Sequence, residues 1–162
     1  MTSLAPASDV AHDISFLFDH NSHVLKTRMS AALAEIGLTP RMHCVLVHAL
    51  EEERTQNQLA EIGDMDKTTM VVTVDALERE GLAERRPSSK DRRARVIAVT
   101  AKGAETAARS QKIVDSVHAE VLNALPEPDR EVFLRALNLL ATGLLAEPVA
   151  STSARRSRER TA

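Results

Sequence analysis

The spacing of apolar residues changes twice in the middle of this 162-residue chain, and this feature limits the possible folds more than any other. Apolar residues first recur at helical spacing in two short segments, Gln56–Ile62 and Lys67–Glu80, with a tight turn between them. Two extended runs follow, Leu82–Arg86 and Arg95–Thr100, joined by a segment rich in Pro, Ser and charge. A helix, a turn and a second helix followed at once by a hairpin predict a winged helix-turn-helix.

Further helices are expected on both sides of this unit. The first runs from about Val10 to Ile36, and the second from Pro40 to about Glu51, with Thr39 as its N-cap. After the hairpin we expect helices over about Ala101–Leu125 and Asp129–Leu145, with prolines breaking the chain between them. The predicted fold class is mainly α: a winged helix-turn-helix with flanking dimerisation helices, in the order α-α-α-α-β-β-α-α.

Composition agrees with one packed helical domain, because the chain has three Phe, no Trp and no Tyr, and its core must be aliphatic. A single cysteine, no apolar run long enough to span a membrane and no signal-peptide pattern predict a cytoplasmic, nucleoid-associated protein without a membrane partner. The expected parts are a disordered N-terminus (1–10), a winged-helix domain (11–145) with a DNA-binding lobe (about 38–100) and dimerisation helices (about 11–36 and 101–145), and a disordered basic tail (146–162).

Positive charge is concentrated in the hairpin. The stretch Arg85–Gly103 holds seven basic residues and one acid, Asp91, although the whole chain has a net charge of -2. Such a basic segment on an acidic body indicates a localised contact with a polyanion. An ordinary solvated loop is the alternative. We expect Asp91 to orient a neighbouring arginine through a charge-assisted hydrogen bond.

The second helix of the pair, Lys67–Glu80, has small residues opposite its apolar stripe of Met70, Val71, Val74 and Leu77. Small side chains allow a helix to sit deep in a major groove, and free amides at its N-terminus attract phosphate. Val72 has two interpretations: contact with a thymine methyl, or an ordinary exposed apolar residue. The predicted DNA-binding residues are Gln56, Lys67, Thr68, Thr69, Val72, Thr73, Ser88, Lys90, Arg92 and Arg93.

The run from Thr55 to Gly103 resembles the DNA-binding core of the MarR family of bacterial transcription regulators. The family's hairpin motif is D-x-R, five residues, Leu and Thr. Here it reads Asp91-Arg92-Arg93 through Val99-Thr100, with Val in place of Leu. The resemblance implies a homodimer with interleaved first, fifth and sixth helices, and a minor-groove role for Arg93, with Arg92 as the second candidate. This chain lacks the basic residue that family members often carry near Val72.

Dimerisation has independent support, because the first and sixth helices carry more apolar residues than a small winged helix can cover. A dimer would place two recognition helices about 34 Å apart, one DNA turn, on a pseudo-palindromic operator. The predicted function is a sequence-specific regulator of transcription that binds double-stranded DNA, and we expect a repressor. The alternative is a winged-helix module for protein assembly or DNA architecture, without sequence-specific reading.

The family resemblance also implies a small phenolic or anionic effector. His23 and His43 are the candidate pocket residues, with Arg28 as an anion partner; surface or interface histidines are the alternative. Cys44 is read as a buried structural residue rather than an oxidation sensor. No spacing completes a metal site and no catalytic motif is present, so we predict neither a metal, a cofactor nor an enzyme.

Overall fold

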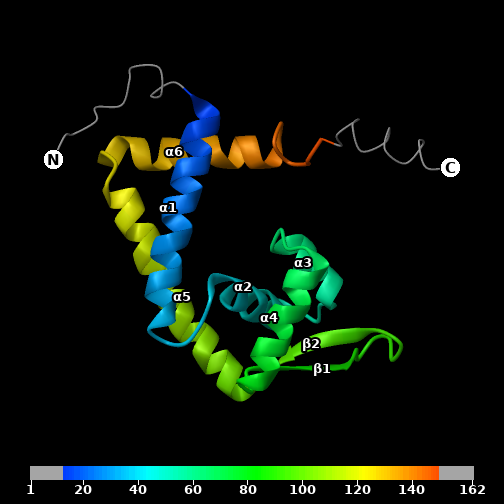
Figure 1. Cartoon of the computed structure of the whole chain (residues 1–162). Coiled ribbons are helices and arrows are strands. Elements are labelled where there is room, and N and C mark those ends of the chain that lie inside the picture. The colour runs from blue at the N-terminus through cyan, green and yellow to red at the C-terminus, as the bar shows by residue number, and fades with distance from the viewer. Residues whose placement is uncertain (1–12, 150–162) are drawn as a thin grey trace, which may run out of the picture. The chain divides into compact units, whose positions relative to one another are not determined.

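The computed structural model describes residues 13–149. The predicted disordered N-terminus (1–10) and all but the first four residues of the predicted disordered basic tail (146–162) lie outside the described residues. The elements follow the predicted order (Figure 1). They are α1 (Ile14–Ala34), α2 (Pro40–Glu51), α3 (Gln56–Ile62), α4 (Lys67–Arg79), β1 (Ala83–Pro87), β2 (Arg95–Val99), α5 (Ala101–Asn123) and α6 (Glu127–Thr142). The mainly α, winged-helix fold class is confirmed. The chain forms two compact units that divide after Ala119.

Side-chain caps start α2, α3 and α4 where the sequence predicts. The Thr39 hydroxyl accepts a hydrogen bond from the Met42 amide at 3.2 Å and opens α2. Thr55 and Gln58 form a reciprocal capping box at the start of α3, and the Asp66 carboxylate accepts from the Thr69 amide at 2.9 Å at the start of α4. Each cap satisfies an amide that has no partner within its helix, so these starts are encoded locally.

Glycine and proline explain where the helices end and where one prediction was wrong. Gly81 adopts a φ of +70° after α4, and the Leu82 amide then donates to the Leu77 carbonyl at 2.9 Å, which closes the helix. The prolines after α5 were expected to delay α6 until Asp129. Instead α6 begins at Glu127, because Pro128 lies in its first turn, where no amide donor is needed.

The hairpin is the wing. Strands β1 and β2 pair antiparallel, from Ala83 opposite Val99 to Pro87 opposite Arg95. The chain just before α3 joins the second strand: the Ile97 amide donates to the Arg54 carbonyl at 3.0 Å. In Figure 1 the hairpin projects beyond α4, with its tip away from the helices of the lobe.

An aliphatic core in the first unit holds the recognition elements together. Its most deeply buried apolar side chains are Leu33, Leu46, Leu59, Met70, Leu77, Val45 and Val74. The core extends onto α5 through Ala107, Val114 and Val117. At the start of α5, Gly103 lies so close to the Leu82 carbonyl that a Cβ there would overlap it. The end of α4, the root of the wing and the start of α5 therefore meet at one tightly packed point.

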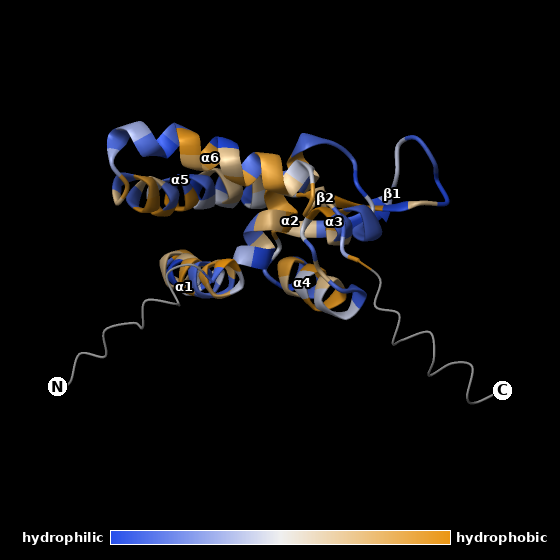
Figure 2. Ribbon diagram, turned by 90° about the horizontal axis from the view of Figure 1, so that it is seen from above, coloured by the Kyte–Doolittle hydropathy of each residue, from blue (hydrophilic) through white to orange (hydrophobic). Residues whose placement is uncertain are grey.

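Apolar surface remains exposed on the flanking helices. Among the described residues of α6 none is buried, and apolar residues recur along both α1 and α6 (Figure 2). The exposed large apolar side chains are Ile14, Phe16, Leu17 and Phe18 on α1, and Val132, Phe133, Leu134, Leu139 and Leu140 on α6. Exposed apolar clusters of this kind mark interaction surfaces.

Candidate nucleic-acid interface

Helix α4 presents a face that differs from the predicted one, most clearly at Thr73 and Val71. Thr73 was expected to face DNA, but its side chain is only 6% exposed and its hydroxyl donates to the Thr69 carbonyl at 2.8 Å. Val71 was expected in the buried stripe, but it is 41% exposed. A threonine can bond back to its own helix, so its polarity does not prevent burial. The outward face is therefore formed by Lys67, Thr68, Val71, Val72, Asp75 and Arg79.

The N-terminus of α4 already holds an anion of the protein itself. The Asp66 carboxylate accepts the Thr69 hydroxyl at 2.6 Å as well as the Thr69 amide. The Thr69 hydroxyl, followed by backbone amides, lowers the pKa of Asp66. The prediction of free amides that attract phosphate was therefore wrong at this end. Lys67 is exposed beside it and keeps its charge available to a ligand.

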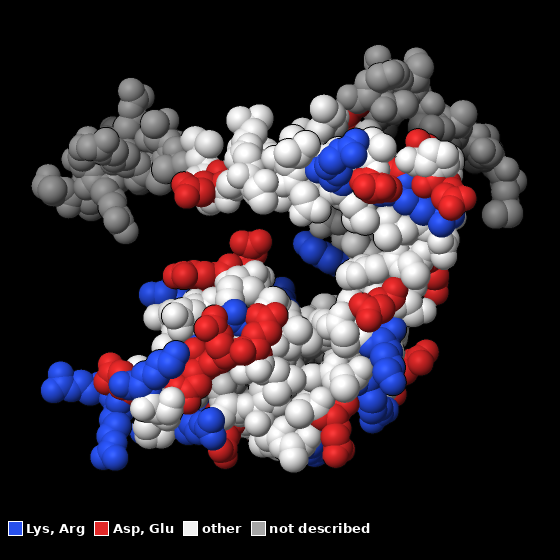
Figure 3. Space-filling model, turned by 180° about the vertical axis from the view of Figure 1, so that it is seen from behind, with Lys and Arg blue, Asp and Glu red and all other residues white. Residues whose placement is uncertain are grey.

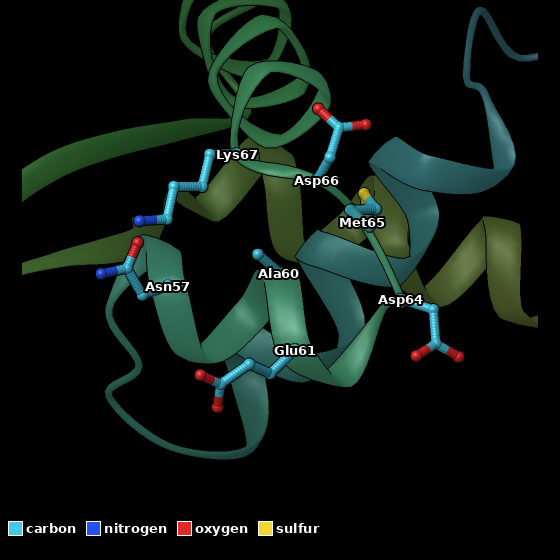
Figure 4. Close-up of a pocket in the computed structure, with 7 residues that line it drawn as sticks. All are labelled: Asn57, Ala60, Glu61, Asp64, Met65, Asp66 and Lys67. Atoms are coloured by element: carbon cyan, nitrogen blue, oxygen red, sulfur yellow. The ribbon is translucent and has the colours of Figure 1, made fainter. Parts of the chain in front are cut away.

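An open hollow of about 490 Å³ lies beside the turn between α3 and α4 (Figure 4). Its lining residues are Asn57, Ala60, Glu61, Asp64, Met65, Asp66 and Lys67. Asn57 and Lys67 lie together at one side, and the Asp64 carboxylate lies at the other. With three carboxylates and one lysine, the hollow does not suit an anionic effector. Its lining includes none of the predicted effector residues.

Arg85 in β1 joins the wing to both helices of the helix-turn-helix. Its guanidinium bonds to Asp75 at 2.7 Å and to Glu78, both on α4, and reaches the Gln56 side-chain oxygen on α3 at 3.3 Å. Its backbone amide donates to Glu78 at 2.8 Å. Gln56, a predicted DNA contact, therefore has its amide oxygen engaged by Arg85. The first arginine of the basic stretch therefore forms contacts within the protein and is not left free for DNA.

Glu53 fixes the wing near its tip. Its carboxylate accepts the Ser88 hydroxyl and the Ser89 hydroxyl, each at 2.9 Å, and the Ser89 amide at 3.0 Å. These hydrogen bonds, led by that of the Ser89 side chain, lower the pKa of Glu53. Ser88 was predicted to contact DNA, but it is only 8% exposed and turned toward Glu53. The carboxylate satisfies the hydroxyl internally, which argues against a DNA contact by Ser88.

The tip keeps its positive charge. Lys90, Arg92 and Arg93 are exposed, and within residues 13–149 none of the three forms an ion pair. Asp91 was predicted to orient an arginine side chain. Instead, its carboxylate accepts a hydrogen bond from the Arg93 backbone amide at 2.9 Å, which shapes the loop. Figure 3 shows Lys and Arg side chains projecting at the end of the wing, with acidic side chains over the neighbouring surface.

The predicted effector residues lie on two helices. His23 and Arg28 are exposed on α1, whereas His43 on α2 is half-buried with its Nδ1 2.8 Å from the Ser110 hydroxyl of α5. Since Ser110 donates to the Ala107 carbonyl, the neutral tautomer of His43 that donates from Nδ1 to Ser110 satisfies both side chains and leaves Nε2 as an acceptor. Burial, followed by nearby His48, lowers the pKa of His43.

Cys44 packs in the helix-turn-helix and is half-buried. A Cβ added to Gly63 would lie 3.3 Å from its sulfur. Burial raises the pKa of this thiol, which disfavours the reactive thiolate. This supports the interpretation of Cys44 as structural. No cluster of three His, Cys, Asp or Glu suited to a metal occurs in the part of the chain that the structure describes.

The arrangement of the projecting basic wing and the exposed helix beside it defines a class: winged helix-turn-helix DNA-binding regulators. Residues 36–94 match the model of the MarR family. CouR from Rhodococcus jostii bound to p-coumaroyl-CoA is 28% identical with a TM-score of 0.75, covering 90% of this chain and 99% of that one. The transcriptional repressor CouR bound to a 23-mer DNA duplex is 26% identical with a TM-score of 0.73, covering 83% and 96%.

A Mycobacterium tuberculosis MarR family protein in complex with salicylic acid is 28% identical, with a TM-score of 0.67, covering 80% of this chain and 98% of that one. The chain is therefore similar to the MarR family of transcription regulators, over residues 36–94 in sequence and over most of its length in fold. No described helix is long and apolar enough to cross a membrane.

Proposed function

We propose that the protein is a homodimeric, cytoplasmic repressor that binds a specific double-stranded operator and releases it when a small effector binds. The observation that carries this proposal is the wing. Arg85 fixes strand β1 of the wing, and Glu53 fixes Ser88 and Ser89 just after it. Arg92 and Arg93 at the tip have no acidic partner among residues 13–149. Two exposed arginines on a positioned thin loop suit the narrow, negative minor groove of A·T-rich DNA.

Helix α4 would enter the adjacent major groove. Its proposed contacts are Lys67, Thr68 and Val72, with Lys90 on the neighbouring phosphates. Thr69 stays a candidate only as a hydrogen-bond acceptor, because its hydroxyl donates to Asp66. In this proposal the DNA-binding lobe spans about 38–100 and the dimerisation helices about 11–36 and 101–145. The CouR structure with a 23-mer DNA duplex supports DNA as the partner.

The dimer is supported by the apolar residues that α6 exposes, above all Leu139 and Val132, and by those of α1. A symmetric partner would bury the same patch on both protomers. It would also place two α4 helices about one DNA turn apart, as an operator with two half-sites requires.

The effector proposal rests on ligand chemistry. CouR is bound to p-coumaroyl-CoA in one structure, and the M. tuberculosis protein is in complex with salicylic acid in another. Both ligands carry a phenol and at least one acidic group. We propose a phenolic or anionic effector for this chain, with His43 Nε2 as its hydrogen-bond acceptor and His23 and Arg28 as further candidates.

Selection of bound duplexes from a random DNA pool tests the function. We expect a pseudo-palindrome with half-sites about ten base pairs apart. Arg93→Ala should then weaken binding to every duplex and reduce the salt dependence by about one unit per protomer, because one cationic side chain fewer displaces counterions from the DNA. Arg109→Ala, exposed on α5, is the matched control and should change neither. No enrichment, with equal binding to all duplexes or none, would favour the protein-assembly or architectural alternative.

A further inference from the structure

The outward face of α4 has few groups that can read bases by hydrogen bonding. The Thr69 hydroxyl donates to Asp66, and the buried Thr73 hydroxyl donates to the Thr69 carbonyl. The Asp75 carboxylate accepts from Arg85 at 2.7 Å. These three polar side chains are therefore bonded within the protein, although the sequence suggests that the two threonines are available.

The middle of the helix also lacks the residues that form bidentate hydrogen bonds with the edge of a purine base. Guanine is read by Arg or Lys and adenine by Asn or Gln. Helix α4 contains no Asn or Gln; its Lys67 is the first residue and its Arg79 the last. Arg79 also lies 3.7 Å from Glu80. The central two turns thus cannot make the common bidentate contacts with guanine or adenine.

Apolar methyl groups occupy the same central turns. Val72 is 63% exposed, the most exposed large apolar side chain of α4. It lies on one line of the helix surface with Thr68 and Asp75, at positions four before and three after it. Val71 is exposed beside this line. The chemistry that this face offers to a groove is a pair of branched aliphatic side chains.

We propose that Val72 determines operator specificity by contacting the 5-methyl group of a pyrimidine, thymine in ordinary DNA, at the centre of each half-site. This inference rests on the proposed function, because it needs α4 to enter the major groove. Thymine displays its methyl group only there, and no other unmodified base pair has a methyl group at that edge. The ligand recognised is a 5-methylpyrimidine, so 5-methylcytosine offers the same methyl group.

The test uses the selected operator and replaces each thymine of a half-site by deoxyuridine, which removes the methyl group alone. Burying one methyl-sized group is worth about 0.8 kcal/mol, or about a fourfold change in affinity. We expect one position per half-site at which uracil weakens binding about fourfold, and about 15-fold when both half-sites carry it. At that position cytosine should bind weakly, and 5-methylcytosine should recover about fourfold.

Val72→Ala should abolish the difference between thymine and uracil at that position, whereas Val71→Ala, the matched control, should preserve it. Val72 is exposed, so its truncation should leave the thermal midpoint unchanged, which a melting curve checks. A uracil scan without any sensitive position overturns this inference, as does a sensitivity that persists in Val72→Ala. In both cases the repressor proposal survives. Failure to select any operator overturns both proposals together.

Discussion

Replacing Arg85 by Met would remove the contacts that hold the wing against α3 and α4 while keeping the aliphatic stem of the side chain. The Arg85 side chain is 30% exposed, and its guanidinium bonds to two carboxylates, Asp75 and Glu78, and to the Gln56 amide oxygen. Because Asp75 is more than half exposed, that pair contributes at most about 1 kcal/mol. The more enclosed bond to Glu78 contributes about 1.5 kcal/mol, and the neutral acceptor about 0.5 kcal/mol.

The expected loss in the free energy of unfolding is therefore about 2–3 kcal/mol. For a chain of this size it corresponds to a decrease in the thermal midpoint of roughly 5–10 °C. Urea denaturation at one fixed protomer concentration measures it, because the stability of a dimer depends on concentration. Arg79→Met is the control: this residue of α4 is exposed, and its loss should stay within about 0.5 kcal/mol.

A second readout separates Arg85 from a DNA contact. Arg85→Met should weaken operator binding through a misplaced wing, but the dependence of affinity on salt should keep its slope, since no phosphate contact is lost. If the unfolding free energy of Arg85→Met fell by less than about 0.5 kcal/mol, or if its salt slope fell as for Arg93→Ala, the assignment of Arg85 as a positioning residue would be refuted.

Three further changes test local features by urea denaturation. Thr55→Ala removes the capping box of α3 and should cost about 1 kcal/mol, whereas an unchanged midpoint would mean that the cap is redundant. Gly103→Ala places a Cβ onto the Leu82 carbonyl and should destabilise by about 3 kcal/mol; a neutral effect would contradict the close packing at the root of the wing. The pKa of Glu53 is lowered, so the stability that its ionised carboxylate contributes is fully present above the usual glutamate pKa and is lost as pH falls through the lowered value. The unfolding free energies of wild type and Glu53→Gln should therefore differ most at neutral pH and converge in acid. A constant difference across that range would exclude ionised Glu53 as the anchor.

The elements were predictable because their signals are local. Caps such as Thr39, Thr55 and Asp66 act within three residues of themselves, and Gly81 ends its helix through its own backbone conformation. Hydrophobic spacing then gives the number and order of the helices. The start of α6 was missed because a proline both breaks a helix interior and suits a first turn, and spacing alone does not choose between the two.

Much of the candidate interface was not predictable, because long-range partners decide which polar groups stay free. Ser88 and Glu53 are 35 residues apart in the chain, and Arg85 and Gln56 are 29 apart. No local pattern connects such residues. Thr73 was missed for a different reason: its hydroxyl bonds within its own helix, so polarity gave the wrong side.

The same long-range pairs explain how an acidic chain can present a basic wing. The carboxylates around the wing do more than repel DNA phosphates. Asp75 and Glu78 bind Arg85, and Glu53 binds Ser88 and Ser89. Arg85 lies in β1, and Ser88 and Ser89 lie just after it at the start of the tip loop, so these contacts end before Arg92 and Arg93. Fixing the wing and focusing its charge at the tip are therefore consequences of one set of acidic residues. Substitution of Glu53, Asp75 and Glu78 should leave more of the hairpin's positive charge unpaired and should also weaken the contacts that hold the hairpin in place. Both changes favour nonspecific over specific binding to DNA.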